Sequence, residues 1–222
     1  CVLQLSKLQS KESIFSFTDI NNEYELLFPK IITSLKQSDL DSDQWLIGKT
    51  EHIKIFNKIN SFPNTVKLID IIEDIEQGQK TGYNKAYVVD EKIIKNNHLE
   101  KHFIKKLVKN SFIDDYFIED REIFLIYASD YMTTKNAPNI IKYLKKFKNQ
   151  LSSRAEAKDN VFPWYRFQRP RKQELFDVKE KIIVPYRATR NKFAYDDLQR
   201  FNDGGDIRIL SNFDKDFDPK YV

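Results

Sequence analysis

Residues 77–85 read Gln-Gly-Gln-Lys-Thr-Gly-Tyr-Asn-Lys, and they separate two segments of strand-like composition. Residues 66–72 are rich in β-branched side chains, and residues 86–89 have the composition of a returning strand. Gly78 and Gly82 permit positive φ angles and the close approach of another backbone. This stretch therefore predicts a strand, a long polar loop and a second strand.

The sequence on either side alternates between helix-like and strand-like patterns. Apolar residues at helical spacing predict three helices, and short apolar runs predict three further strands. The clearest helix carries Ile140, Leu144, Phe147 and Leu151 on one face, with lysines opposite. Such a mixture predicts an α+β domain from about residue 45 onward. The expected helices span residues 50–59, 99–108 and 139–154, and the expected strands span 123–127, 182–184 and 207–210.

The first 44 residues have a different organisation. Residues 1–5 and 14–17 have strand-like composition, and a lone hairpin is only marginally stable in water. We therefore expect residues 1–18 to end an upstream domain whose other strands precede them. Residues 19–44 are more polar and predict a connecting helix and linker, followed by one domain over 45–222. Because the chain begins with Cys rather than Met, we expect it to be part of a longer protein.

The composition is that of a folded protein with a slight excess of positive charge. The chain has 222 residues, of which 41% are hydrophobic and 14% aromatic, enough for a core. Its 37 basic and 33 acidic residues leave a net charge of +4, which permits a polyanionic partner without requiring one. The single cysteine, Cys1, excludes a disulfide framework. No apolar run approaches the ~20 residues that cross a bilayer, so we expect a soluble, cytoplasmic protein without a membrane partner.

The motifs of nucleotide-binding and hydrolytic enzymes are absent. The sequence contains no Gly-x-Gly-x-x-Gly, no Gly-x-x-x-x-Gly-Lys-Ser/Thr and no Gly-x-Ser-x-Gly segment. His98 and His102 are four residues apart, but no His-Glu-x-x-His motif is formed and Lys101 lies between them, which favours a solvated face over a metal site. Acid-x-Lys triplets, which some metal-dependent nucleases use, are no more frequent than chance predicts. We therefore predict no catalytic, cofactor-binding or metal-ligating residue in this chain.

Three segments combine cations with aromatic rings or hydrogen-bond donors. The loop 77–85 carries two lysines, residues 162–172 interleave four aromatic and four basic side chains, and residues 185–191 repeat that composition at a strand end. Aromatic rings stack on bases, and basic side chains bind phosphates or guanine edges. The three segments therefore predict a nucleic-acid-binding groove. The alternatives are a polar hairpin loop without a ligand and, for Trp164, a place in the core with its basic neighbours extended into solvent.

Residues 78–90 resemble the Gly-x-x-Thr-Gly-x-Asn-x-Ala-Phe signature of the TaqI-like specificity domain. That domain follows the catalytic domain in many adenine-N6 DNA methyltransferases and in fused restriction–modification enzymes. Later parts of it match in order, so that the likeness covers about residues 45–222. The matching residues are Leu125-Ile126-Tyr127, Pro138, Tyr143-Leu144, Leu151, Arg154, Trp164-Tyr165, Arg169-Pro170-Arg171, Lys181-Ile182-Ile183 and Phe193-Ala194-Tyr195-Asp196.

The resemblance implies a mixed sheet-and-helix target recognition domain that binds double-stranded DNA. Residues 1–18 then resemble the last strands of the family's Rossmann-type methyltransferase domain, which would be a partner within the same chain. The catalytic Asn/Asp-Pro-Pro-Tyr/Phe tetrapeptide and the S-adenosylmethionine loop of that domain are absent here. Residues 218–221, Asp-Pro-Lys-Tyr, resemble the start of a following helix and imply truncation at the C-terminus. The implied parent is a bacterial, adenine-specific methyltransferase that uses S-adenosylmethionine; a fused Type II restriction endonuclease would also need Mg²⁺.

The resemblance and the basic segments together define the candidate DNA-binding residues. In the family, basic side chains set the register on the phosphates, and loops read base edges in the major groove. Two other classes remain open, a Type I-like specificity subunit without catalysis and a basic protein-interaction domain. The candidate residues are Lys80, Thr81, Gly82, Tyr83, Asn84, Lys85, Trp164, Tyr165, Arg169, Arg171, Lys172, Tyr186, Arg187 and Arg190.

Overall fold

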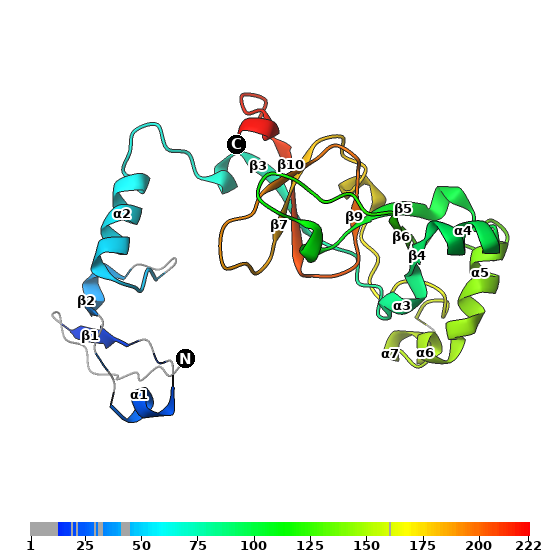
Figure 1. The fold of residues 1–222 in the computed structure, drawn as a ribbon, viewed down its shortest axis with the longest axis horizontal. Helices are drawn as coiled ribbons and strands as arrows, with labels where there is room; N and C mark the ends of the chain where they lie inside the picture. The colour runs from blue at the N-terminus through cyan, green and yellow to red at the C-terminus, as the bar shows by residue number, and fades with distance from the viewer. Residues whose placement is uncertain are drawn as a thin grey trace. The chain divides into compact units, whose positions relative to one another are not determined.

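The computed structural model describes residues 13–18, 20, 22–28, 30, 33–40, 45–159 and 161–222. The chain divides into two compact units, residues 1–66 and 67–222, and Figure 1 shows the fold of each unit. The strand expected at residues 1–5 lies outside the described residues. Residues 45–66, which the sequence assigned to the recognition domain, belong to the N-terminal unit by their contacts. The assignment of functions to the chain's parts stays a prediction.

The N-terminal unit contains a small antiparallel sheet. Strand β1 (Ile14–Phe17) confirms the strand predicted at these residues. Its described partner is β2 (Thr33–Lys36), which lies in the segment that the sequence assigned to a helix and linker. A short 3-10 helix, η1 (Gln37–Asp39), follows β2 directly. The linker segment therefore contributes a strand as well as a helix.

Two α-helices lie among the described residues of the N-terminal unit. Asn22 caps α1 (Glu23–Leu27) by accepting a hydrogen bond from the Glu25 amide at 3.0 Å. Helix α2 (Thr50–Asn60) confirms the helix predicted at 50–59, but none of its residues is buried. Helical spacing of apolar residues thus predicted the helix correctly without predicting burial.

The C-terminal unit contains two four-stranded sheets. The first has the strand order β3-β10-β7-β8, with every neighbouring pair antiparallel. The second has the order β4-β6-β5-β9, with a parallel pairing between β5 and β9. Strands β6, β7 and β10 confirm the strands predicted in their regions. The strands are β3 (Ile72–Gln77), β4 (Val88–Asp90), β5 (Ile104–Val108), β6 (Ile123–Ile126), β7 (Lys181–Pro185), β8 (Ala194–Asp196), β9 (Phe201–Asn202) and β10 (Ile207–Phe213).

Short helices connect and cover the strands of this unit. Figure 1 shows α4 and α5 beside the second sheet. Among the described residues, no helix is long and apolar enough to span a membrane. The α-helices are α3 (Asn84–Tyr87), α4 (Glu91–Asn97), α5 (Pro138–Leu144), α6 (Lys148–Ser152) and α7 (Ala155–Lys158). The 3-10 helices are η2 (Leu68–Asp70), η3 (Lys101–Phe103), η4 (Asn110–Phe112), η5 (Lys145–Phe147), η6 (Gln173–Leu175) and η7 (Pro219–Tyr221).

The largest hydrophobic cluster joins the second sheet to α5 and α6. Ile140, Leu144 and Leu151 are fully buried in it, which confirms the apolar face predicted for residues 139–154. The structure divides that predicted helix into α5, η5 and α6. The mixture of sheets and helices confirms the α+β class.

Three local predictions are corrected by the structure. The strand expected at 66–72 is wrong over most of its length, because η2 occupies part of it and β3 begins at Ile72. Residues 84–87 form α3 before β4 begins, where the end of the loop and a strand were expected. The helix expected at 99–108 is wrong, because η3 and β5 lie there. A short apolar run fits either helical or strand periodicity, and pairing of β5 with both β6 and β9 selects the strand.

Candidate nucleic-acid interface

The loop between β3 and α3, residues 78–83, packs against β9 and the turn after it. Gly78 is buried, and a Cβ atom at this position would lie 2.2 Å from the main-chain oxygen of Gly204. The Gln79 amide donates a hydrogen bond to the Asn202 carbonyl at 3.1 Å. Only glycine therefore fits at position 78, and direct backbone contact fixes the start of the loop.

The other side of this loop pairs with the second basic segment. The Lys80 amide donates to the Arg169 carbonyl at 3.2 Å, and the Arg169 amide donates to the Lys80 carbonyl at 2.9 Å. The fully buried Gln79 side chain accepts a hydrogen bond from the Arg171 amide at 2.6 Å, across 92 residues of sequence. Two basic segments that are distant in sequence are therefore neighbours in the folded unit.

Thr81 and Asn84 make hydrogen bonds within the unit. The Thr81 side chain is 1% exposed, and its hydroxyl is hydrogen-bonded to the Asn84 side-chain oxygen and accepts from the Tyr83 amide at 3.2 Å. The Asn84 amide group donates to the Asp203 carboxylate at 3.0 Å. Burial raises the pKa of Asp203, and Lys109, whose Nζ lies 3.6 Å from that carboxylate, opposes the rise. These bonds hold the shape of the loop, so the two motif residues have a structural role in the free protein.

A buried arginine joins the loop to the aromatic segment. The guanidinium of Arg154 donates to the carbonyls of Thr81 at 2.7 Å, Trp164 at 2.6 Å and Arg166 at 2.8 Å. Its Nε donates to the Leu151 carbonyl at 2.9 Å, and the residue is 9% exposed. The sequence singled out Arg154 only through the family resemblance. The structure shows that it fixes three chain segments relative to one another.

Apart from the buried Thr81, the predicted site residues fall into exposed and half-buried groups. Tyr83, Trp164 and Tyr165 are half-buried and pack against the main hydrophobic cluster. The rings of Trp164 and Tyr165 meet edge to face at 5.6 Å, and the ammonium of Lys148 lies 5.7 Å from the centre of the Trp164 ring. These rings therefore contribute to the core of the unit. The exposed predicted residues are Lys80, Gly82, Asn84, Lys85, Arg169, Arg171, Lys172, Tyr186, Arg187 and Arg190.

The third basic segment connects β7 to β8 and contacts β10. The Tyr186 amide donates to the Asp206 carbonyl at 2.7 Å. The guanidinium carbon of Arg208 lies 4.0 Å from the centre of the exposed Tyr186 ring. Arg208 is paired with Gln77 in the register of β3 and β10, next to the start of the loop. The sequence patterns missed Arg208, since a single arginine within a strand carries no local signal of binding.

Arg190 differs from its neighbours in the same segment because acidic side chains surround it. Its guanidinium donates to the Asp114 carboxylate at 2.9 Å and lies 3.1 Å from that of Asp115. A hydrogen bond from the Asp115 amide, assisted by Lys192 and Arg190, holds the pKa of Asp114 below its usual value. By contrast, Arg187 is exposed and lies beside the Tyr186 ring at 5.8 Å. Arg190 is therefore largely neutralised in the free protein.

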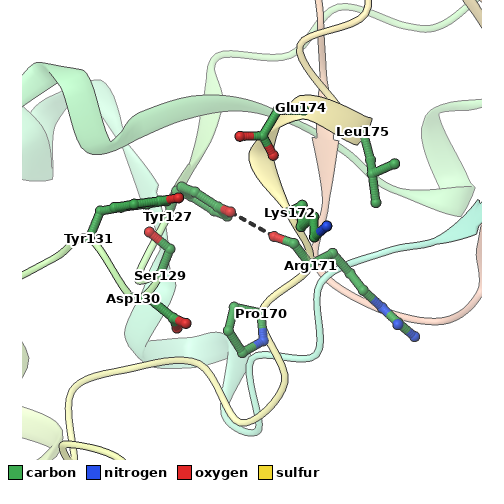
Figure 2. Close-up of a pocket in the computed structure, with 9 residues that line it drawn as sticks. All are labelled: Tyr127, Ser129, Asp130, Tyr131, Pro170, Arg171, Lys172, Glu174 and Leu175. Carbon is green, nitrogen blue, oxygen red and sulfur yellow. Dashed lines mark hydrogen bonds between the residues drawn. The ribbon is translucent and has the colours of Figure 1, made fainter.

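A pocket of about 730 Å³ lies beside the second basic segment (Figure 2). The Tyr127 hydroxyl donates a hydrogen bond to the Arg171 carbonyl at 2.6 Å, whereas the Arg171 guanidinium extends away from Tyr127 (Figure 2). Burial raises the pKa of Tyr127 to about 12, so its hydroxyl keeps its proton at neutral pH. The buried Tyr127 thus anchors the main chain of the second basic segment at Arg171. The pocket is lined by Tyr127, Ser129, Asp130, Tyr131, Pro170, Arg171, Lys172, Glu174 and Leu175.

The paired segments offer positive charge and hydrogen-bond donors from a fixed backbone. Such groups bind phosphate oxygens and the edges of bases. The carboxylate of Glu156 lies near them and accepts hydrogen bonds from the Gln168 amide group at 3.0 Å. Within the described ranges, no group of three or more His, Cys, Asp and Glu side chains could hold a metal ion.

No protein-family model matches the chain. Over 200 residues, 82% of its length, the chain is 28% identical to the Type II methyltransferase M.MjaIV of Methanocaldococcus jannaschii, of which the match covers 64%. The structure also superposes on part of the Type IIL restriction–modification enzyme MmeI, solved in complex with DNA, with a TM-score of 0.51 and 12% identity. That match covers 92% of this chain and 26% of MmeI. The chain is thus similar in sequence to a Type II methyltransferase and in fold to part of a restriction–modification enzyme.

Proposed function

We propose that residues 67–222 recognise a specific double-stranded DNA site for a restriction–modification enzyme that methylates adenine at N6. The observation that carries this proposal is the main-chain pairing of Lys80 with Arg169. It joins two basic segments on a scaffold that includes the buried side chains of Gln79 and Arg154. The similarities to M.MjaIV, a methyltransferase, and to MmeI, solved with DNA, support the same assignment.

In this proposal, the domain binds DNA and leaves the chemistry to an upstream methyltransferase domain of the same protein. Exposed cations contact phosphates and set the register, while side chains of the loops read base edges in the major groove. The target adenine then leaves the helix and enters the catalytic domain. S-adenosylmethionine would supply the methyl group there, and a fused nuclease domain would need Mg²⁺. The described residues of this chain provide binding and orientation.

The experiment that tests this function is selection from a randomised DNA duplex pool at two salt concentrations, with the folding of the chain verified first. Salt-dependent retention with an enriched sequence supports specific recognition by this chain. Salt-dependent retention without enrichment supports phosphate binding alone and argues against independent readout. Absence of binding by the folded chain contradicts the proposal.

Substitution of one exposed lysine tests the position of the interface. Lys80→Ala is expected to weaken binding to all duplexes by a similar factor and to reduce the slope of log affinity against log salt by about 1. Lys142→Ala is the matched control, because Lys142 is also exposed but lies on α5. Titration of labelled duplex at several salt concentrations measures both effects. Equal slopes for Lys80→Ala and the wild-type chain would remove the loop from the interface.

A further inference from the structure

Arg208 is held in a defined orientation at the start of the candidate interface. Its guanidinium carbon lies 4.0 Å from the centre of the Tyr186 ring, and Nη1 donates to the Gly205 carbonyl at 3.0 Å. Tyr186 is itself anchored, since its amide donates to the Asp206 carbonyl at 2.7 Å. Nη1 of Arg208 also donates to the Ile207 carbonyl at 3.4 Å. The aromatic contact and these hydrogen bonds together restrict how the guanidinium can turn.

The remaining donors of this guanidinium are available to a ligand. Nε and Nη2 of Arg208 make no hydrogen bond or ion pair with any described residue. Neither atom is a fully buried nitrogen without a partner, so solvent reaches both. Nε and Nη2 share one edge of the planar group and present two parallel N–H donors. This pair of donors, the arginine fork, can bind two acceptor atoms that lie side by side in a ligand.

Two other arginines of the described residues lack this combination. Arg121 lies 4.5 Å from the centre of the Phe112 ring, but it donates to the Glu119 carboxylate at 2.7 Å. Arg200 is bonded to the Asp196 carboxylate at 2.6 Å and is buried. In both residues a carboxylate already occupies donors of the guanidinium. Arg208 has the stacked geometry without an acidic partner.

The register of the sheet brings this fork to the signature loop. Arg208 is paired with Gln77, the residue from which the loop departs, and Gly78 packs against Gly204 in the turn before β10. An arginine fork reads O6 and N7 of guanine, which are adjacent acceptors in the major groove. Resting on the proposed DNA-binding function, we propose that Arg208 is a specificity-determining residue that recognises one guanine of the target site.

The test compares conservative variants by selection from the randomised duplex pool. Arg208→Lys keeps the positive charge but loses the planar two-donor fork. It is expected to reduce preference for guanine at one position of the enriched sequence by about 5- to 150-fold, while general affinity and the salt slope stay close to those of the wild-type chain. Arg121→Lys is the matched control, because Arg121 is also stacked on a ring, and it is expected to leave the enriched sequence unchanged. Circular dichroism and thermal melting establish that each variant is folded.

The possible results separate this inference from the function on which it rests. Selective loss of one guanine in Arg208→Lys, with the other positions retained, supports the inference. An unchanged enriched sequence, or a uniform loss of affinity with a smaller salt slope in Arg208→Ala, indicates no base contact or a phosphate contact and overturns it. Wild-type binding without any enriched guanine overturns it as well, while DNA binding stands. Absence of binding by the folded wild-type chain overturns the proposed function and the inference together.

Discussion

Arg154 and Arg190 attach two basic segments to the C-terminal unit in opposite ways. Arg154 is buried and donates to four main-chain carbonyls, whereas the side chain of Arg190 is 59% exposed and meets two surface carboxylates. Loss of a buried donor leaves its acceptors without partners, but water replaces a surface ion pair at little cost. Two basic segments of similar composition are therefore held to the unit by very different interactions.

Removal of the buried arginine is expected to have the largest effect. Arg154→Met removes four hydrogen bonds that a buried, charged group donates to main-chain carbonyls, and should lower the free energy of unfolding by about 4 kcal/mol. Urea denaturation followed by circular dichroism measures this loss. Lys158→Met, at an exposed position of α7, is the matched control and should change stability little. Similar losses in the two variants would show that Arg154 does not hold the segments together.

Lys181 is buried at the start of β7, the strand that leads to the third basic segment. Its titration tests how the folded unit holds the start of that strand. Burial lowers the pKa of Lys181 to about 8 from 10.5, although Asp196, whose carboxylate lies 3.5 Å away, opposes the shift. Between these two values the unfolded chain binds a proton that the folded chain does not, so the free energy of unfolding rises with pH. This contribution is complete above about pH 10.5 and is lost as the pH falls toward 8.

The contribution of Lys181 is measured as a difference between two proteins. The free energy of unfolding of the wild-type chain minus that of Lys181→Met should increase from pH 8 to 10.5, by about 3 kcal/mol at most. The subtraction removes the titration of tyrosines and of other lysines. Urea denaturation at half-unit pH intervals gives the difference. A flat profile across this window would show that Lys181 keeps an ordinary pKa in the folded protein.

Loss of the surface arginine is expected to have the smallest effect. Arg190→Ala should lower the melting temperature by no more than about 4 °C, because its ion pairs are exposed to solvent and salt. It should also weaken DNA binding less than Lys80→Ala, since Asp114 and Asp115 already neutralise much of its charge. Thermal melts and duplex titrations at matched salt check both statements. A fall in stability equal to that of Arg154→Met would abolish the contrast between the two segments.

Local sequence patterns predicted elements correctly where packing in the folded unit agreed with the spacing of the apolar residues. Four apolar residues at helical spacing over 139–154 predicted a helix with a buried face, and the structure confirms it. The run at 99–108 also had apolar residues at helical spacing, but its pairing with β6 and β9 made its second half a strand. Residues 50–60 formed the expected helix, but their apolar side chains stay unburied because burial depends on what packs against them.

The candidate site likewise combines features that the sequence predicts with features that depend on the folded structure. The composition of the loop identified Lys80, Thr81, Gly82 and Asn84, the aromatic and basic composition of residues 162–172 identified Arg169, and the resemblance assigned the loop residues to DNA contact. The pairing of the two segments could not be predicted, because it depends on hydrogen bonds between residues far apart in sequence. Arg208 gave no signal, since its importance comes from the ring of Tyr186 and from its register with β3.

The sequence by itself determined the α+β composition, the three basic segments and the absence of familiar nucleotide-binding motifs. These properties follow from residue type and local spacing, which act before the chain folds. The tertiary structure alone decided that Thr81 is buried while Lys80 is exposed, that Arg154 binds carbonyls rather than a ligand, and that Arg208 lies beside the loop. Burial and partnership are relations between distant residues, so they exist only once the sheets and helices have packed.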